Sequence, residues 1–356
     1  MSKIEDAGQH PFLIAARNRR PPWVPVWFMR QAGRSLPEYR RLREKHSILE
    51  MCTTPELAAE ATLQPVRRLG VDAAVLFSDI MVPLWRMGIG LDIEPGRGPL
   101  IEDPIRSRSG ITRLRPLRPE EDVPEVLEAI RILKKELDVP LIGFAGAPFT
   151  LACYLVEGGP SRDQTRTKTL MRAEPRLWDE LMERLTGATL AYLRAQVGAG
   201  ADAVQLFDSW AGNLSPAAYE RYVFPYSKKI LEGLAGAGVP RIHFGVAAGE
   251  LLALMAAAGA DVVGVDWRVP LDAARQRVDG RALQGNLDPT ALLAPYDRMK
   301  REALAVLRAG DGSGHIFNLG HGVLPQTDPN NLKRLVDLVH ETDPVELQDT
   351  RELKDG

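Results

Sequence analysis

The stretch GADAVQLF at residues 200–207 joins the end of a predicted helix to a predicted strand. Its first four residues recur in similar form as GVDA at 70–73 and as GADV at 259–262. In each copy the glycine can end a helix in the left-handed region, and the aspartate begins the turn into an apolar run. This recurrence predicts a repeated unit in which a helix leads directly into a strand.

Eight apolar runs have the length and composition of buried strands. They are residues 24–29, 73–77, 141–144, 203–207, 241–244, 262–265, 282–284 and 316–318. Segments with helical periodicity lie between them, and residues 54–69 are the clearest because a threonine and a proline mark the helix start. Further helices are expected at 125–137, 175–197, 215–234, 250–257, 290–307 and 329–340.

This alternation predicts an α/β protein, with residues 1–356 forming a single (β/α)8 barrel domain of the TIM type. A doubly wound sheet is the alternative, but no G-x-G-x-x-G follows any predicted strand. Glycines and prolines interrupt short apolar pieces between Asp79 and Pro124, so we expect an excursion after the second strand, with a hairpin at the barrel mouth. Peripheral tails are expected at about residues 1–10 and 342–356.

Composition limits the classes of function. The net charge is −2, which gives no electrostatic reason to expect nucleic acid or a membrane surface as a partner. No apolar run is long enough to span a bilayer, and the N-terminus has no apolar signal segment, so we expect a cytoplasmic protein. The two cysteines, Cys52 and Cys153, form no C-x-x-C pair, and H-E-x-x-H is absent, so no metal site is expected.

The first predicted strand ends in the polar segment RQAGR at residues 30–34. Arg30 and Arg34 keep their charge at any working pH, and each offers a planar fork that fits a carboxylate or phosphate. The alternative is that both arginines form surface salt bridges. Because barrel enzymes carry their chemistry where strands end, the position favours an anion-binding site.

Other strand ends add further polar side chains. Asp79 lies between apolar runs, so its carboxylate is paired with Arg30 or Arg34, protonated, or reserved for a ligand. His321 lies between two glycines and has either a structural or a functional role. Ser209 is not expected to be a nucleophile, because G-x-S-x-G is absent.

Several of these segments together resemble the uroporphyrinogen decarboxylase family. The strongest matches are PVWFMRQAGR at 25–34 and GFAGAPFTLACY at 143–154. FSDI at 77–80, QLFDS at 205–209, LQGNLDP at 283–289 and NLGHG at 318–322 follow in the family's order. The resemblance extends from about Pro11 to His340. The chain departs from the family at Ser35, where tyrosine is common, and at 245–248, where members often place a lysine.

The resemblance implies a homodimeric (β/α)8 barrel of haem and tetrapyrrole biosynthesis. Such an enzyme removes carbon dioxide from the four acetate arms of uroporphyrinogen III, giving coproporphyrinogen III without a metal or organic cofactor. By the same resemblance, Asp79, Arg30 and Arg34 would be the catalytic residues. The implied substrate-binding residues are Arg30, Gln31, Arg34, Asp79, Phe144, Tyr154, Phe207, Ser209 and His321.

This chemistry suits the residue types. Without a cofactor the substrate must be its own electron sink, which protonation of a pyrrole α-carbon would provide. Asp79 would stabilise the resulting cationic ring, and the proton could come from an arginine, a tyrosine or water. One alternative is a zinc-dependent corrinoid or thiol methyltransferase of the same barrel superfamily, which needs a His/Cys ligand set that the sequence lacks. A second alternative is a non-catalytic tetrapyrrole-binding protein.

Overall fold

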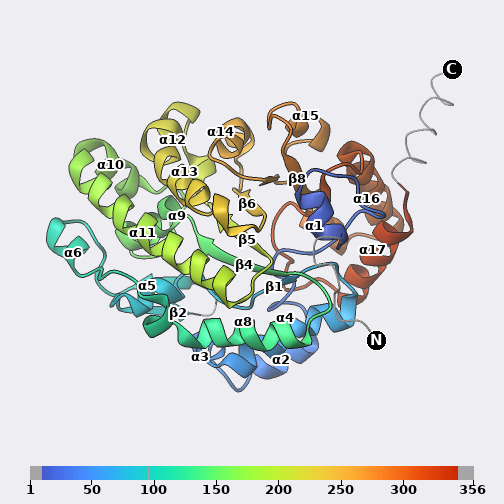
Figure 1. The fold of residues 1–356 in the computed structure, drawn as a ribbon, viewed down its shortest axis with the longest axis horizontal. Helices are drawn as coiled ribbons and strands as arrows, with labels where there is room; N and C mark the ends of the chain where they lie inside the picture. The colour runs from blue at the N-terminus through green and yellow to red at the C-terminus, as the bar shows by residue number, and fades with distance from the viewer. Residues whose placement is uncertain (1–9, 95, 344–356) are drawn as a thin grey trace.

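Seven parallel strands form one curled sheet in the computed structural model, which describes residues 10–94 and 96–343. The helices lie in an arc around the outside of this sheet (Figure 1). The predicted tails fall almost entirely outside the described residues. In order of hydrogen bonding, the strands are β1 (Ala74–Val75), β4 (Leu141–Gly146), β5 (Ala203–Phe207), β6 (Arg241–Phe244), β7 (Val262–Gly264), β8 (Ala282–Leu287) and β9 (His315–Leu319).

Every predicted helix contains helical structure, although two predicted helices are divided. Residues 215–234 form two helices that meet at Val223, because Pro225 cannot donate a backbone hydrogen bond within one continuous helix. Pro295 interrupts residues 290–307 in the same way. The helices of the predicted regions are α4 (Pro55–Leu69), α8 (Pro124–Glu136), α11 (Pro175–Ala199), α12 (Pro216–Tyr222), α13 (Phe224–Gly233), α14 (Leu252–Ala257), α16 (Tyr296–Gly310) and α17 (Pro329–Glu341).

Further helices were not predicted from periodicity. Most are short, so they span too few turns to show a helical pattern. They are α1 (Pro11–Ala16), α2 (Pro37–Arg43), α3 (Ile48–Thr53), α9 (Pro148–Glu157), α10 (Thr165–Ala173) and α15 (Leu271–Arg275). Single 3-10 turns lie at Ala211–Asn213, Ala235–Ala237, Gly249–Leu251 and Pro289–Leu293.

The repeated glycine and aspartate turns share one geometry. Gly70, Gly200 and Gly259 all have positive φ, at +70°, +122° and +102°, which only glycine adopts without strain. In the second copy, the N–H of Asp202 donates to the carbonyl of Leu141, the first residue of β4, at 2.8 Å. The carboxylate of Asp202 accepts the N–H of the same leucine at 2.8 Å. The turn therefore pairs with the start of the preceding strand through both backbone groups.

The other two copies make the same pair of contacts. Asp261 binds both backbone groups of Arg241, the first residue of β6, at 2.9 Å each. Asp72 binds the carbonyl of Val26 at 2.8 Å and its N–H at 2.7 Å. Val26 therefore occupies the position that the first residue of a strand occupies in the other two copies.

The prediction of a regular strand at residues 24–29 is wrong. Val26 forms only an isolated parallel bridge to Phe317 of β9, where Trp27 N donates to the Phe317 carbonyl at 3.3 Å. The N–H groups of Phe28 and Met29 instead donate to side-chain oxygens, Oε1 of Gln31 at 2.9 Å and Oδ1 of Asn318 at 3.0 Å. Because side chains satisfy these groups, the segment stays extended and buried without forming a ladder.

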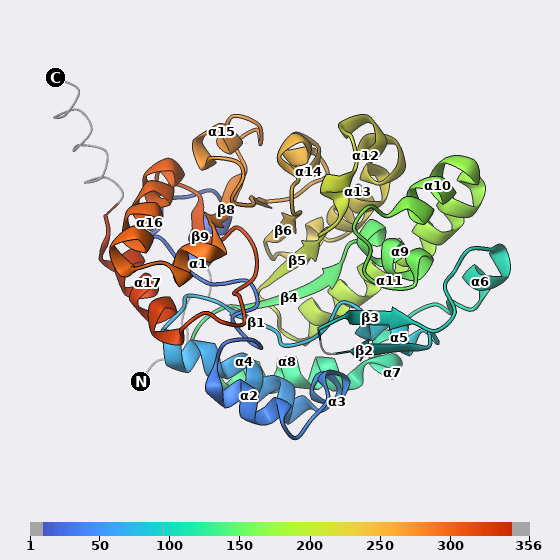
Figure 2. The same ribbon diagram turned by 180° about the vertical axis from the view of Figure 1, so that it is seen from behind.

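The excursion after β1 contains the expected antiparallel hairpin, formed by β2 (Leu91–Glu94) and β3 (Gly98–Ile101). Ile101 N donates to the Gly158 carbonyl at 2.9 Å, which ties the hairpin to the end of α9. Figure 2 shows β2 and β3 beside α5, away from the strands of the large sheet. The excursion also holds three short helices, α5 (Val82–Arg86), α6 (Arg108–Thr112) and α7 (Pro119–Asp122).

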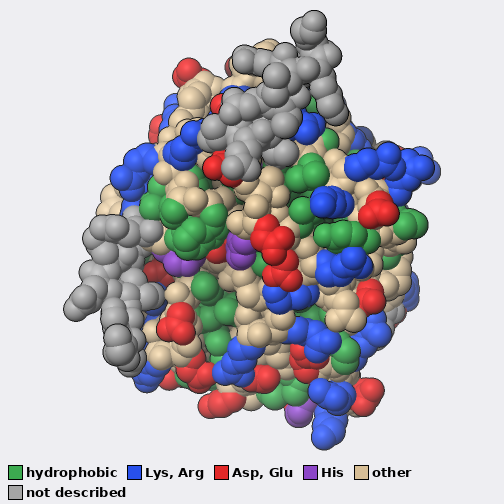
Figure 3. Space-filling model, turned by 90° about the vertical axis from the view of Figure 1, so that its right-hand side faces the viewer, with side chains coloured by type: hydrophobic (Ala, Val, Ile, Leu, Met, Phe, Trp, Pro, Cys, Tyr) green, Lys and Arg blue, Asp and Glu red, His purple; other side chains and the backbone are tan. Residues whose placement is uncertain are grey.

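Charges of both signs are mixed over the face of the molecule shown in Figure 3. This mixture agrees with the near-neutral net charge of −2. Within residues 10–94 and 96–343, no helix has the length and apolar character needed to cross a membrane.

Candidate active site

Gln31 fixes the backbone of the RQAGR segment. Its side chain is buried, its Oε1 accepts the N–H of Phe28 at 2.9 Å, and its Nε2 donates to the Ala73 carbonyl at 2.9 Å. Both ends of the amide are therefore bound to backbone. Arg30, the residue before it, has a positive φ of +61°, so this anchoring holds a backbone conformation that arginine rarely adopts. Gln31 thus acts on the site through the position of its neighbour.

The aliphatic part of Arg30 lies against Gly322, the residue that follows His321. A methyl group on Gly322 would collide with the aliphatic part of Arg30, so the glycine is what allows this close approach. Arg30 is solvent-accessible, but the protein around it lowers the pKa of its guanidinium. The charge of Asp79 and the phenol of Tyr154 act in the opposite direction. Arg30 therefore lies in an open site, within electrostatic range of both groups.

Asp79 follows β1 and is half-buried. Burial raises the pKa of its carboxyl group, while the Met81 N–H, bound to Oδ1 at 2.8 Å, and the charge of Arg30 lower it by less. Among the described residues, neither Asp79 nor Arg30 nor Arg34 forms an ion pair within 4.0 Å. The structure therefore does not show the salt bridges that were the alternative interpretation of Arg30 and Arg34.

Tyr154 lies on α9 and packs against Trp210, with ring centroids 4.8 Å apart. Burial, followed by the negative charge of Asp79, raises the pKa of its phenol to about 12. The phenol therefore remains protonated at neutral pH and can donate a hydrogen bond into the site.

His321 follows β9, and its ring is nearly parallel to that of Trp267, with centroids 6.4 Å apart. Burial, together with the positive charge of Arg30, lowers the pKa of the imidazole to about 4. His321 is therefore neutral at pH 7, and its buried Nδ1 is left without a hydrogen-bond partner among the described residues.

Phe144 lies within β4 and Phe207 is the last residue of the adjacent β5, and their rings pack edge to face with centroids 5.4 Å apart. Ser209 is half-buried in the loop that follows Phe207. Asp208, between them, is fully buried, and its Oδ1 accepts a hydrogen bond from Oγ1 of Thr150 at 3.0 Å. These two neighbouring strands provide a pair of apolar rings, and the polar loop after β5 is held by Asp208.

Electrostatic interactions connect four of the predicted residues, namely Arg30, Asp79, Tyr154 and His321. Within the part of the chain that the structure describes, Arg34 and Ser209 make no hydrogen bond to these four residues. Sequence reasoning assigned no role to Trp210 or Trp267, which pack against Tyr154 and His321. Both tryptophans lie shortly after a strand, β5 or β7, and this position could have indicated that they border the site.

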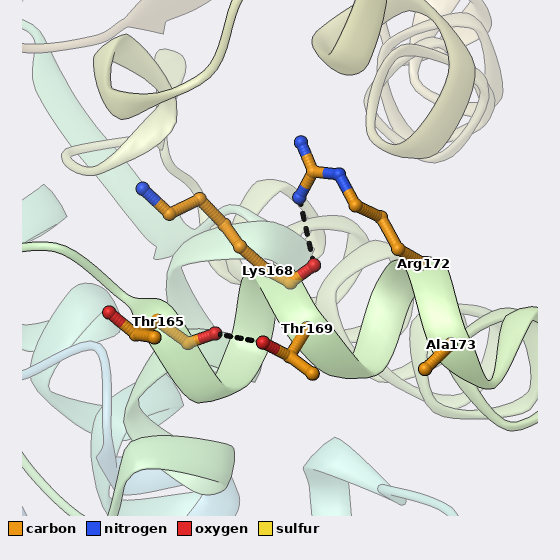
Figure 4. Close-up of a pocket in the computed structure, with 5 residues that line it drawn as sticks. All are labelled: Thr165, Lys168, Thr169, Arg172 and Ala173. Atoms are coloured by element: carbon orange, nitrogen blue, oxygen red, sulfur yellow. Dashed lines mark hydrogen bonds between the residues drawn. The ribbon is translucent and has the colours of Figure 1, made fainter.

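A separate depression of about 420 Å³ lies along α10 and involves none of the predicted residues. Figure 4 shows that two of its polar groups bind within the helix. Thr169 Oγ1 donates to the Thr165 carbonyl at 2.8 Å, and Arg172 Nη1 donates to the Lys168 carbonyl at 2.8 Å. The depression therefore gives no reason to move the candidate site.

The metal-dependent alternative depends on a ligand cluster. No group of three or more His, Cys, Asp or Glu side chains in residues 10–94 and 96–343 is placed to hold a metal ion. Cys52 and Cys153 are both buried and unpaired.

Comparisons with solved structures address the fold. A methyltransferase from Methanosarcina mazei aligns with a TM-score of 0.76 at 23% identity, covering 94% of this chain and 98% of that one. A B12-independent methionine synthase from Shewanella sp. W3-18-1 aligns with a TM-score of 0.55 at 10% identity, covering 94% and 96% of the two chains. At these identities the likeness concerns the fold alone.

Comparisons of sequence identify the family. The uroporphyrinogen decarboxylase (URO-D) family matches residues 8–342. The uroporphyrinogen decarboxylase of Salinispora tropica is 60% identical over 339 residues, covering 94% of this chain and 91% of that protein. That of Streptomyces coelicolor is 61% identical over 344 residues, covering 94% and 97%. This chain therefore belongs to the uroporphyrinogen decarboxylase family.

Proposed function

We propose that this chain removes carbon dioxide from the four acetate arms of uroporphyrinogen III, giving coproporphyrinogen III in haem and tetrapyrrole biosynthesis. The observation that carries this proposal is the group formed by Arg30, Asp79, Tyr154 and His321. A cation and a carboxylate face the same site and remain without a salt bridge, which suits a ligand that has both carboxylates and N–H donors.

Asp79 would accept hydrogen bonds from the pyrrole N–H groups. Its Oδ1 already accepts the N–H of Met81, so Oδ2 would be the atom that binds them. Protonation of a ring α-carbon makes the pyrrole cationic, and the C–C bond electrons then flow into the ring as carbon dioxide leaves. The exocyclic carbon next takes up a proton to become a methyl group, while the ring releases the first proton. The carboxylate of Asp79 would stabilise the cationic stage.

The ring proton would come from Arg30, from Tyr154 or from a water molecule, and both side chains interact electrostatically with Asp79. Tyr154, which is protonated at neutral pH, would in each case serve as a hydrogen-bond donor. Arg34 would bind carboxylate arms that do not react, Ser209 and His321 would add polar contacts, and Phe144 and Phe207 would line the apolar wall.

We also propose that the curled sheet is part of a complete (β/α)8 barrel. Val26 is bound on one side by β9 and on the other by Asp72, which supports residues 24–29 as the eighth member of a complete barrel. We further propose a cytoplasmic homodimer that works without a metal or organic cofactor and that has no nucleic acid or membrane partner.

The test is anaerobic incubation with uroporphyrinogen III, with products separated by their number of carboxyl groups. We expect successive loss of four carboxyl groups, unchanged by a chelator. Activity that disappears with EDTA and returns with zinc would instead favour the methyltransferase alternative. Tight binding of the substrate with no loss of carboxyl groups would favour the non-catalytic one. Sedimentation of the purified protein would test the dimer.

A further inference from the structure

A second guanidinium, outside the residues assigned above, is held in a fixed orientation after β7. Arg268 Nη1 lies 2.8 Å from Oδ2 of Asp266, and the Arg268 Cζ lies 3.9 Å from the centre of the Trp267 ring. The salt bridge and the cation–π contact together fix the plane of the guanidinium. A cation that is fixed before binding loses less entropy when it meets an anion.

The carboxylate of Asp266 is used entirely in contacts within the protein. Its carboxylate is 3% exposed and also accepts the N–H of Arg268 at 2.9 Å and the N–H of Ala247. Asn286 Nδ2 donates to the carbonyls of Asp266 and Val269, at 2.8 and 2.6 Å, which holds the loop from the end of β8. The loop is therefore rigid through buried contacts that do not use the outer part of Arg268.

Arg268 itself remains open. Its side chain is 49% exposed, and only one nitrogen of its guanidinium is bound to Asp266. A guanidinium has five N–H donors, so several remain available for an incoming carboxylate.

The position of Arg268 connects it to the candidate site. Trp267 lies beside His321, and the backbone of Trp267 lies so close to Gly320 that a side chain there would collide with it. On the other side of His321, Gly322 contacts Arg30. The charges of both Arg30 and Arg268 act on the His321 imidazole. The two arginines therefore flank the same histidine.

We propose that Arg268 binds a carboxylate arm of the substrate at the rim of the site, across His321 from Arg30. The ligand class is an alkyl carboxylate, and its identity as a substrate arm rests on the proposed function. Arg268 would orient the macrocycle without touching the reacting carbon, so it is a binding residue and takes no part in proton transfer.

The experiment compares Arg268→Gln and Arg268→Lys with Arg67→Gln. Arg67 is a matched control because it is 56% exposed and bound to carboxylates, Glu60 and Glu136, but lies on α4 outside the site. Two quantities are measured on each purified protein. One is the dissociation constant of uroporphyrin, an octacarboxylate that is not turned over, followed by quenching of tryptophan fluorescence. The other is the kcat and KM for uroporphyrinogen III.

We expect Arg268→Gln to raise both the dissociation constant and KM by about tenfold, as for loss of one charge-assisted contact, with kcat within about twofold of wild type. Arg268→Lys should recover part of the loss, and Arg67→Gln should change nothing. An unchanged dissociation constant in Arg268→Gln would overturn the proposal, as would a lower kcat with unchanged binding. A lower melting temperature of Arg268→Gln would mean that its weaker binding could come from a damaged fold. In that case Arg268→Lys decides, because it keeps the charge, and its failure to restore binding would also overturn the proposal. Absence of turnover by the wild type would reject the proposed function, while the uroporphyrin comparison would still report on Arg268.

Discussion

Oγ1 of Thr150 and Oδ1 of Asp208 are joined by a hydrogen bond of 3.0 Å between two fully buried side chains. The same hydroxyl accepts the N–H of Trp210 at 3.4 Å. The other carboxylate oxygen, Oδ2, lies 3.9 Å from Nε2 of the buried His243. One hydroxyl on α9 thus holds both ends of the loop that carries Ser209.

Replacement of Thr150 by valine should destabilise the protein by about 1–3 kcal/mol, because the buried Asp208 loses its hydrogen-bond donor while the side-chain volume stays nearly constant. The free energy of unfolding in urea measures this change, and kcat/KM should fall with it as the Ser209 loop loosens. Thr150→Ser, which keeps the hydroxyl, should retain both. Thr169→Val on the exposed face of α10 is the control. Equal stability of Thr150→Val and wild type would show that the bond does not hold the loop.

Asp79→Asn should lower kcat by about 100-fold or more, because an amide cannot stabilise a cationic ring as a carboxylate does. Circular dichroism should show an unchanged fold. Asp92→Asn, on the exposed side of the β2–β3 hairpin, controls for the loss of a negative charge elsewhere. Near-normal turnover by Asp79→Asn would show that the assigned role is wrong.

The stability of the same variant should depend on pH in a defined direction. Burial raises the pKa of Asp79 above its usual value of 3.8, so the folded state holds this proton to a higher pH than the unfolded state does. Ionisation of Asp79 therefore costs stability as the pH rises above about 4. Urea unfolding should show Asp79→Asn at least as stable as wild type at pH 7, with the advantage vanishing at pH 3.5. A variant that is less stable at pH 7 would contradict the raised pKa.

Two histidines should destabilise the fold in acid. Burial lowers the pKa of His315 and of His321 to about 4, from the ordinary 6.5. Between these values the unfolded chain binds protons that the folded one does not, so stability falls as the pH drops from 6.5 towards 4. His315→Gln should flatten this slope, whatever its effect at pH 7. An unchanged slope in His315→Gln would contradict the lowered pKa of this imidazole.

The proposed role of Arg268 predicts how substrate binding depends on salt. If Arg268 binds a carboxylate arm, the advantage of wild type over Arg268→Gln in uroporphyrin affinity should shrink as sodium chloride is raised from about 0.05 to 0.5 M, because salt screens an exposed charge. Titrations at several salt concentrations measure this. A difference that does not vary with salt would point to altered packing around Trp267.

Most of the sheet was predictable because each strand is a short apolar run that ends in a polar residue. Residues 24–29 share that pattern, but the acceptors that replace a ladder come from Gln31, Asp72 and Asn318, and their pairing depends on the folded geometry. Arg30 and Asp79 were assigned to the site because each follows an apolar run, and their roles stay predictions. The roles of Thr150 and Arg268 could not be predicted in this way, because each depends on a partner that only the tertiary structure identifies.

The bridge between Val26 and Phe317 has a consequence for the newly made chain. The backbone before Arg30 gains this neighbour only when β9 has been synthesised, and contacts between residues so far apart in the chain are slow to form. A growing chain that lacks β9 therefore also lacks the acceptors that Phe317 and Asn318 provide for the N–H groups of Trp27 and Met29.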